Sequence, residues 1–131
     1  MKYMLDTNTC IYLMKNVPAV VEQYRANKHM GICISATVLA ELYFGVYNSS
    51  NVAKNGANLT NFLLGLDILD FCGSAAIEYG IIRAVLQKRG LRIGSMDLLI
   101  AAHAKAAGLV LVTNNTREFL RVGGLQVENL A

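Results

Sequence analysis

The sequence predicts an α/β protein, a three-layer α/β/α sandwich in which helices cover both faces of a mostly parallel central sheet. Two observations support this prediction. Short apolar runs alternate along the chain with longer stretches typical of helices, and the runs are apolar throughout, as in strands that are covered on both faces. Strands that alternate with helices form right-handed parallel units. In such folds, ligands bind outside the carboxyl ends of the strands.

The apolar runs and the helical stretches can be placed in order. The predicted strands are residues 3–5, 31–34, 66–69, 109–112 and 125–127. The predicted helices are residues 10–15, 18–26, 36–47, 53–65, 75–89 and 96–107. A loop is expected over residues 48–56, which are rich in Asn and Ser. The expected helix N-caps are Ser35, Ser74, Ser95 and, for a further short helix, Thr116, while Gly90 and Gly108 are expected to end helices.

Length and composition indicate one folded domain over residues 1–131. The mass is 14.3 kDa, and 54% of the residues are hydrophobic against 16% charged, which supplies a core and argues against disorder. This apolar fraction is above the usual range, so part of it is expected to cover a partner surface. The net charge of +3 permits a nucleic-acid partner without arguing for one.

The cysteines and the N-terminal residues indicate a reducing, cytoplasmic compartment. Cys10, Cys33 and Cys72 are odd in number and lack zinc-ligand spacing, so they are expected to be buried, reduced thiols. The first apolar run is too short for a signal peptide and ends in an acid, and no segment has the length of a membrane span.

Three acidic residues stand out because each lies in apolar surroundings. Asp6 follows the first predicted strand, where a helix N-cap is its simplest role. Glu41 is the one charged residue of the helix predicted over 36–47, and an unpaired carboxylate at the edge of a buried face is costly. Asp97 lies in the first turn of the helix predicted over 96–107, where the helix dipole favours an acid. Each acid therefore has both a structural and a functional interpretation.

The functional interpretation requires the three acids to meet. Two carboxylates ~4 Å apart repel by roughly 4 kcal/mol at an effective dielectric constant of about 20. Such a cluster persists only with divalent cations or shared protons. The chain offers oxygen ligands and no set of Cys or His, so Mg²⁺ or Mn²⁺ is the expected ion. Sites of this kind mostly serve phosphate chemistry.

A second strand end repeats the pattern of the first. The strand predicted over 109–112 runs into Thr113-Asn114-Asn115, as the first strand runs into Asp6-Thr7-Asn8. We expect these two ends to lie on one edge of the sheet. His103, in contrast, is expected to be a packed structural residue, since no other residue at a ligand spacing accompanies it.

Four motifs resemble those of a known family. They are MLDTN at 4–8, ISATVLAEL at 34–42, IGSMDLLIAAHA at 93–104 and LVTNNTREF at 111–119. In this order and at this length, the sequence resembles the PIN-domain ribonucleases and, among them, the VapC toxins of bacterial toxin–antitoxin pairs. The TNNTREF and IG-x-x-D forms are most similar to the enterobacterial and Haemophilus branch.

The resemblance implies a PIN-domain fold and Mg²⁺- or Mn²⁺-dependent hydrolysis of RNA that leaves a 5′-phosphate and a 3′-hydroxyl. It implies that Asp6 and Asp97 are the principal metal ligands and that Glu41 completes the site and helps to orient the attacking water. The residues expected to support the metal and water are Thr7, Asn8, Thr113 and Asn115.

The chain departs from the family pattern at one position. Many PIN domains have a fourth acid where this chain has Asn115, which adds no charge and puts a second tightly held metal in doubt. Glu118, three residues later, is a candidate replacement.

The resemblance also implies a substrate and partners. The branch is associated with cutting initiator tRNA in its anticodon stem-loop, with a cognate VapB antitoxin that lies across the active-site groove, and with homodimers. Phosphate contacts are expected from basic residues near the predicted helix 75–89 and the last motif, namely Arg83, Lys88, Arg89, Arg92 and Arg117.

Two other classes of function stay open on the sequence alone. Haloacid-dehalogenase-type phosphatases begin with a D-x-D motif at a strand end, but the second position here is Asn8, which cannot act as a general acid. The other alternative is a noncatalytic module whose acidic pocket binds metal for structure.

Overall fold

The chain was analysed as a computed structural model that describes residues 1–129, and in these residues five strands form one parallel sheet in the order β3-β2-β1-β4-β5. The strands are β1 (Tyr3–Leu5), β2 (Ile32–Ser35), β3 (Asp67–Leu69), β4 (Val110–Val112) and β5 (Val127–Glu128). The register aligns Leu5 with Val112 across β1 and β4. Asp6 therefore leaves the sheet beside the end of β4, and its backbone N–H continues the ladder by donating to the carbonyl of Val112 at 3.0 Å.

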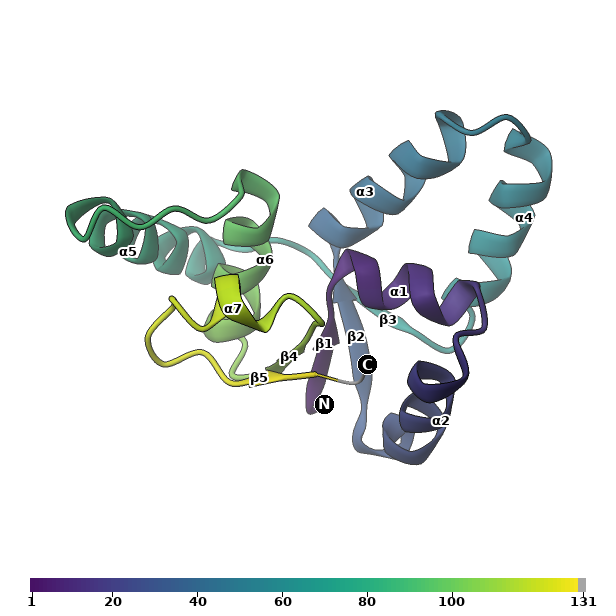
Figure 1. Cartoon of the computed structure of the whole chain (residues 1–131), viewed down its shortest axis with the longest axis horizontal. Coiled ribbons are helices and arrows are strands. Elements are labelled where there is room, and N and C mark those ends of the chain that lie inside the picture. The colour runs from purple at the N-terminus through teal and green to yellow at the C-terminus, as the bar shows by residue number, and fades with distance from the viewer. Residues whose placement is uncertain (130–131) are drawn as a thin grey trace.

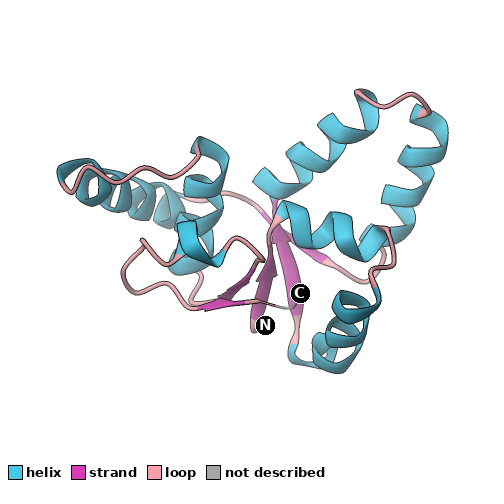
Figure 2. Ribbon diagram, viewed as in Figure 1, coloured by secondary structure: helices cyan, strands magenta, loops and turns pink. Residues whose placement is uncertain are grey.

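Helices lie on both sides of the sheet, as predicted (Figure 1 and Figure 2). They are α1 (Thr7–Met14), α2 (Pro18–Asn27), α3 (Ala36–Tyr47), α4 (Val52–Leu63), α5 (Gly73–Lys88), α6 (Ser95–Ala106) and α7 (Thr116–Phe119), with a 3₁₀ turn at Lys28–Met30. From β1 to β3 the strands progress in one direction with α1 to α4 between them, and from β3 to β5 they return across the sheet with α5 to α7. Right-handed crossovers put these two sets on opposite faces.

The acids lie near the point at which the order of strand addition reverses, between β1 and β4. The connections after β1 and after β4 leave in opposite directions, and the carboxyl ends of these two neighbouring strands therefore flank an open position. The strands themselves are rigid there, because Met4, Leu5, Leu111 and Val112 are almost completely buried. The apolar runs around the acids thus supply a packed base for polar side chains at the sheet edge.

Several local predictions need correction. The loop expected over 48–56 ends early, because Asn51 caps α4 by accepting from the N–H of Lys54 at 3.1 Å. Ser74, Ser95 and Thr116 lie inside helices rather than at their caps, which are Cys72, Gly94 and Asn115. Ser35 does cap α3, by accepting from the N–H of Thr37 at 3.1 Å. Gly90 and Gly108 have positive φ values of 68° at the ends of α5 and α6, as expected.

Burial departs from the sequence prediction in two further places. Cys10 and Cys33 are buried thiols, but Cys72 is exposed, because the residue that precedes α5 lies outside the core. Strand β3 is an edge strand and its first two residues, Asp67 and Ile68, are exposed. The rule that parallel strands are covered on both faces therefore applies to the central strands only. Within residues 1–129, no helix combines the length and apolar character needed to cross a membrane.

Candidate active site

Asp6 is fixed at the end of β1 by the start of the next helix. Its side chain is 4% exposed, and one carboxylate oxygen accepts a hydrogen bond from the backbone N–H of Thr9 at 2.9 Å. The Thr9 hydroxyl donates to the carbonyl of Val112 at 3.2 Å and so ties α1 to the end of β4. The predicted N-cap role is thus confirmed. Capping leaves the second carboxylate oxygen outside this bond, so the structural role does not compete with a functional one.

Glu41 is held against the first motif. It lies half-buried on α3, and one of its carboxylate oxygens accepts a hydrogen bond of 2.5 Å from the hydroxyl of Thr7. Thr7 follows Asp6 directly and begins α1. Thr7 therefore joins two of the three acids that stand out in the sequence, across 34 positions of the chain.

The pKa of Asp97 shows that the other acids lie near it. Its position in the first turn of α6 is half-buried, and this burial is the main reason that its pKa rises from 3.8 to about 6. The negative charges of Glu118, Asp6 and Glu41 raise its pKa further, in that order. The structure therefore brings together the three acids picked out in the sequence, and Glu118, the candidate replacement for the fourth acid, lies with them.

Glu118 is fixed beside Asp97 by two donors. One of its oxygens accepts from the backbone N–H of Gly94 at 2.7 Å and the other from the side-chain amide of Asn115 at 2.8 Å. These hydrogen bonds lower the pKa of Glu118, with the bond from Asn115 as the larger cause. A Cβ atom built at Gly94 would lie 3.7 Å from Asp97 Oδ2 and 3.9 Å from Glu118 Oε1. Asn115 therefore positions an acid near Asp97 instead of supplying one.

The four acids suit a hard divalent cation in type and in charge. All their donor atoms are carboxylate oxygens, and the mutual repulsion that raises the pKa of Asp97 is what a bound cation would relieve. Within residues 1–129, no three Asp, Glu, His or Cys side chains are placed to coordinate one ion together. Glu41 and Glu118 accept hydrogen bonds from Thr7, Gly94 and Asn115 instead.

The remaining predicted residues fall into supporting and peripheral positions. Thr113 is fully buried, and its hydroxyl accepts from the N–H of Asn115 at 2.9 Å, which shapes the turn before α7. Asn8 is exposed, and no side-chain hydrogen bond joins it to residues 1–129. His103 is the structural residue that was expected: it is buried, with Nδ1 2.7 Å from Ser35 Oγ and its ring edge-on to Phe71.

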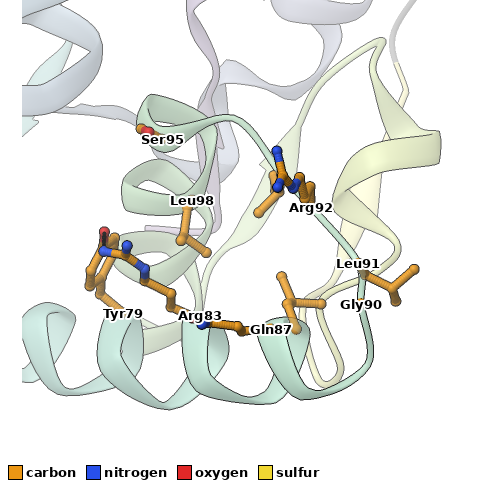
Figure 3. Close-up of a pocket in the computed structure, with 10 residues that line it drawn as sticks. Tyr79, Arg83, Gln87, Gly90, Leu91, Arg92, Ser95 and Leu98 are labelled. Carbon is orange, nitrogen blue, oxygen red and sulfur yellow. Dashed lines mark hydrogen bonds between the residues drawn. The ribbon is translucent and has the colours of Figure 1, made fainter.

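The basic residues do not gather in one place. Arg83 and Arg92 line a cavity of about 640 Å³ beside α5 and the start of α6 (Figure 3). Lys88, Arg89 and Arg117 are exposed and do not line it.

Two contacts of this region were not predicted. The amide of Asn114 donates to the Tyr12 hydroxyl at 2.8 Å and joins the end of β4 to α1. The backbone N–H of Gly94 anchors Glu118. The glycine stands in a motif that the sequence analysis quoted, but a backbone donor leaves no signature in the identity of its residue.

The fold and the acid cluster belong to a recognised class. The sequence matches the PIN domain family over residues 3–125. Individual relatives then narrow the class. The chain is 46% identical over 130 residues to the tRNA(fMet)-specific endonuclease VapC of Shigella flexneri and 45% identical over 130 residues to ribonuclease VapC2 of Haemophilus influenzae, with 98% of each chain covered in both cases.

Solved structures agree with these relatives. The fold superposes with a TM-score of 0.95 and 41% identity on the crystal structure of VapBC2 from Rickettsia felis bound to a promoter DNA fragment, covering all of both chains. It superposes with a TM-score of 0.94 and 42% identity on DNA-bound VapBC from Salmonella typhimurium, covering 100% of this chain and 99% of that one. The chain belongs to the VapC ribonucleases of the PIN-domain family. The phosphatase alternative is not favoured by these relationships.

Proposed function

We propose that this protein is the toxin of a toxin–antitoxin pair and that it hydrolyses RNA phosphodiester bonds with the help of Mg²⁺ or Mn²⁺ at the acid cluster. The observation that carries the proposal is the position of Asp97, whose pKa is raised first by burial and then by the charges of Glu118, Asp6 and Glu41, which come from three other parts of the fold. The charges of three acids from separate parts of the chain act on a fourth, Asp97, near the carboxyl edge of the sheet.

Some side chains of the site would bind the ion, and others position the acids by hydrogen bonds. Asp6 and Asp97 would be the principal ligands, and Glu41, with Glu118 as a further candidate, would complete the set. A divalent ion bound there would supply positive charge to a phosphodiester and lower the pKa of water. The N–H of Thr9 holds one oxygen of the Asp6 carboxylate in place.

The chain's own groups also fix the geometry around the acids. The Thr7 hydroxyl holds Glu41, and Gly94 and Asn115 hold Glu118. These donors keep charged groups close together that would otherwise turn away from one another, so they prepare the site for a cationic ligand. The apolar strands below exclude water from the inner side of the cluster.

The substrate we propose is initiator tRNA, cut in its anticodon stem-loop. Support comes from two relatives that are named as tRNA(fMet)-specific endonucleases, at 46% and 43% identity over 130 residues. Such a substrate implies action in the cytoplasm and an arrest of translation and growth. We further propose a VapB-type antitoxin as partner, which the VapBC complexes among the structural neighbours support, and self-association into a dimer.

An activity assay tests the chemistry. Purified protein is incubated with RNA and separately with a phosphomonoester, in Mg²⁺, in Mn²⁺ and in EDTA. The proposal expects cleavage of RNA only, its loss in EDTA, and its loss in Asp6→Asn and Asp97→Asn. Hydrolysis of the phosphomonoester alone would support the phosphatase alternative. No activity at all, together with saturable metal binding, would support the noncatalytic module.

A second assay tests the substrate. Purified tRNAs are treated individually, and the ends of the fragments are sequenced. The proposal expects one cut in the anticodon stem-loop of initiator tRNA, with a 5′-phosphate on the downstream fragment, while elongator tRNAs stay intact. Equal cutting of many tRNAs would show that the substrate assignment is wrong but would leave the ribonuclease assignment in place.

A further inference from the structure

A cavity beside the acid cluster has the chemistry of a nucleotide-binding site. It has a volume of about 640 Å³ and lies between α5, the segment 90–93 and the start of α6. Figure 3 shows Tyr79 and Arg83 at one end, Arg92 at the other, and Leu98 between them. Two arginines and no acid line this cavity, so its charge is opposite to that of the neighbouring carboxylates.

The aromatic end of the cavity is already organised. The guanidinium of Arg83 donates to the Tyr79 hydroxyl at 3.0 Å, and its Cζ lies 5.9 Å from the centre of the Tyr79 ring. The two residues are one helical turn apart on α5. Arg83 thus stays beside the ring although its side chain is exposed. A planar guanidinium next to an aromatic ring offers a stacking surface for a base together with charge for a phosphate.

The other side of the cavity is tied to the acid cluster. Arg121 donates to the backbone carbonyl of Arg92, and the N–H of Gly94 donates to Glu118 at 2.7 Å. The segment that forms this side is therefore held at two points by α7 and the residues after it. Ser95 and Leu98, which line the cavity, are the neighbours of Asp97 along α6. The cavity is therefore connected to the acid cluster through the segment 92–98.

We propose that this cavity binds one unpaired nucleotide of the RNA substrate next to the cleaved bond, with its base against Tyr79 and Arg83 and its phosphate near Arg92. This inference rests on the proposed ribonuclease function and adds a subsite to it. Single-stranded loops present unstacked bases for recognition of this kind. Gln87, which lines the same cavity, offers an amide donor and acceptor for the edge of the base.

Binding and cleavage together test the subsite. The cleavage-inactive Asp97→Asn protein is titrated with a fluorescent anticodon stem-loop RNA over a series of salt concentrations, in combination with Arg83→Gln or Arg92→Gln. Each is expected to weaken binding about tenfold and to lower the salt slope by about one. In the active protein, the same changes are expected to raise KM with little change in kcat. Arg25→Gln on α2 is the matched control, because it removes the same charge from an exposed position on the opposite side of the molecule (Figure 1).

Cross-linking tests the base contact directly. A stem-loop that carries 5-iodouridine at successive loop positions is expected to cross-link to Tyr79 from one position, and Tyr79→Leu is expected to abolish that cross-link and raise KM. Equal effects of Arg25→Gln and Arg83→Gln, with no cross-link at Tyr79, would overturn the subsite while RNA cleavage by the wild type upheld the proposed function. Loss of antitoxin affinity with unchanged RNA affinity in Arg83→Gln would assign the cavity to an acidic peptide instead. A wild-type protein that neither binds nor cleaves RNA would remove both proposals.

Discussion

Asp97→Asn is expected to stabilise the metal-free protein while abolishing its activity. The rise in the pKa of Asp97 from 3.8 to about 6 corresponds to about 3 kcal/mol at ~1.4 kcal/mol for each pH unit. The group is half-buried, so solvent screening reduces this to about 1–2 kcal/mol. Removing an acid from the first turn of α6 costs about 0.5 kcal/mol of helix-dipole energy. The free energy of unfolding of Asp97→Asn is therefore expected to exceed that of the wild type by about 1 kcal/mol, which corresponds to roughly 2–6 °C in melting temperature.

The sign of the pH dependence follows from the direction of the shift. A carboxyl group whose folded pKa is raised destabilises the folded state when it is ionised, so the cost is complete above about pH 6 and disappears as the pH falls towards 3.8. The advantage of Asp97→Asn is therefore largest at pH 7.5 and shrinks towards pH 4. Thermal unfolding in EDTA at several pH values measures it, with Glu22→Gln, an exposed acid of α2, as control.

Two results would refute this reasoning. One is a less stable Asp97→Asn protein in EDTA at pH 7.5, and the other is an advantage that does not change with pH. Addition of Mg²⁺ or Mn²⁺ provides an independent check. Binding to the folded state adds stability by mass action, so the wild type is expected to gain more than the variant. Equal stabilisation of the wild type and Asp97→Asn by the metal would show that the ion binds away from Asp97.

The remaining predictions concern three other side chains. Asp6→Asn keeps an amide oxygen to accept from Thr9, so cleavage is expected to fall below detection with a melting temperature within about 2 °C of the wild type, since Asn and Asp cap equally well; a large loss of stability would contradict this. Glu118→Gln is expected to lower activity at limiting Mn²⁺, and an unchanged Mn²⁺ dependence would remove Glu118 from the site. Burial lowers the pKa of His103, so protonation of this residue reduces the free energy of unfolding as the pH falls below its ordinary pKa of 6.5. In urea titrations at several pH values, the free energy of unfolding of His103→Gln is expected to fall less steeply with pH. An unchanged pH dependence would contradict this.

The central strands and two of the helix caps follow from local patterns of residues. The continuous apolar runs predicted the buried strands β1, β2 and β4, because a strand covered on both faces has little room for polar side chains. Asp6 and Ser35 are caps whose chemistry is local, since each bonds a backbone N–H within three residues. Glu41 and Asp97 are unusual on sequence alone, because each is an acid among apolar residues.

The contacts between distant side chains depend on how the elements pack. Glu118 joins the acids through Gly94, across 24 positions of the chain, and local pattern carries no information about a contact of that range. The cavity of Tyr79 and Arg83 depends equally on how α5 packs beside α6. Local caps are fixed by short-range hydrogen bonds and can be predicted from sequence, whereas a charge cluster exists only where separate elements close on one another.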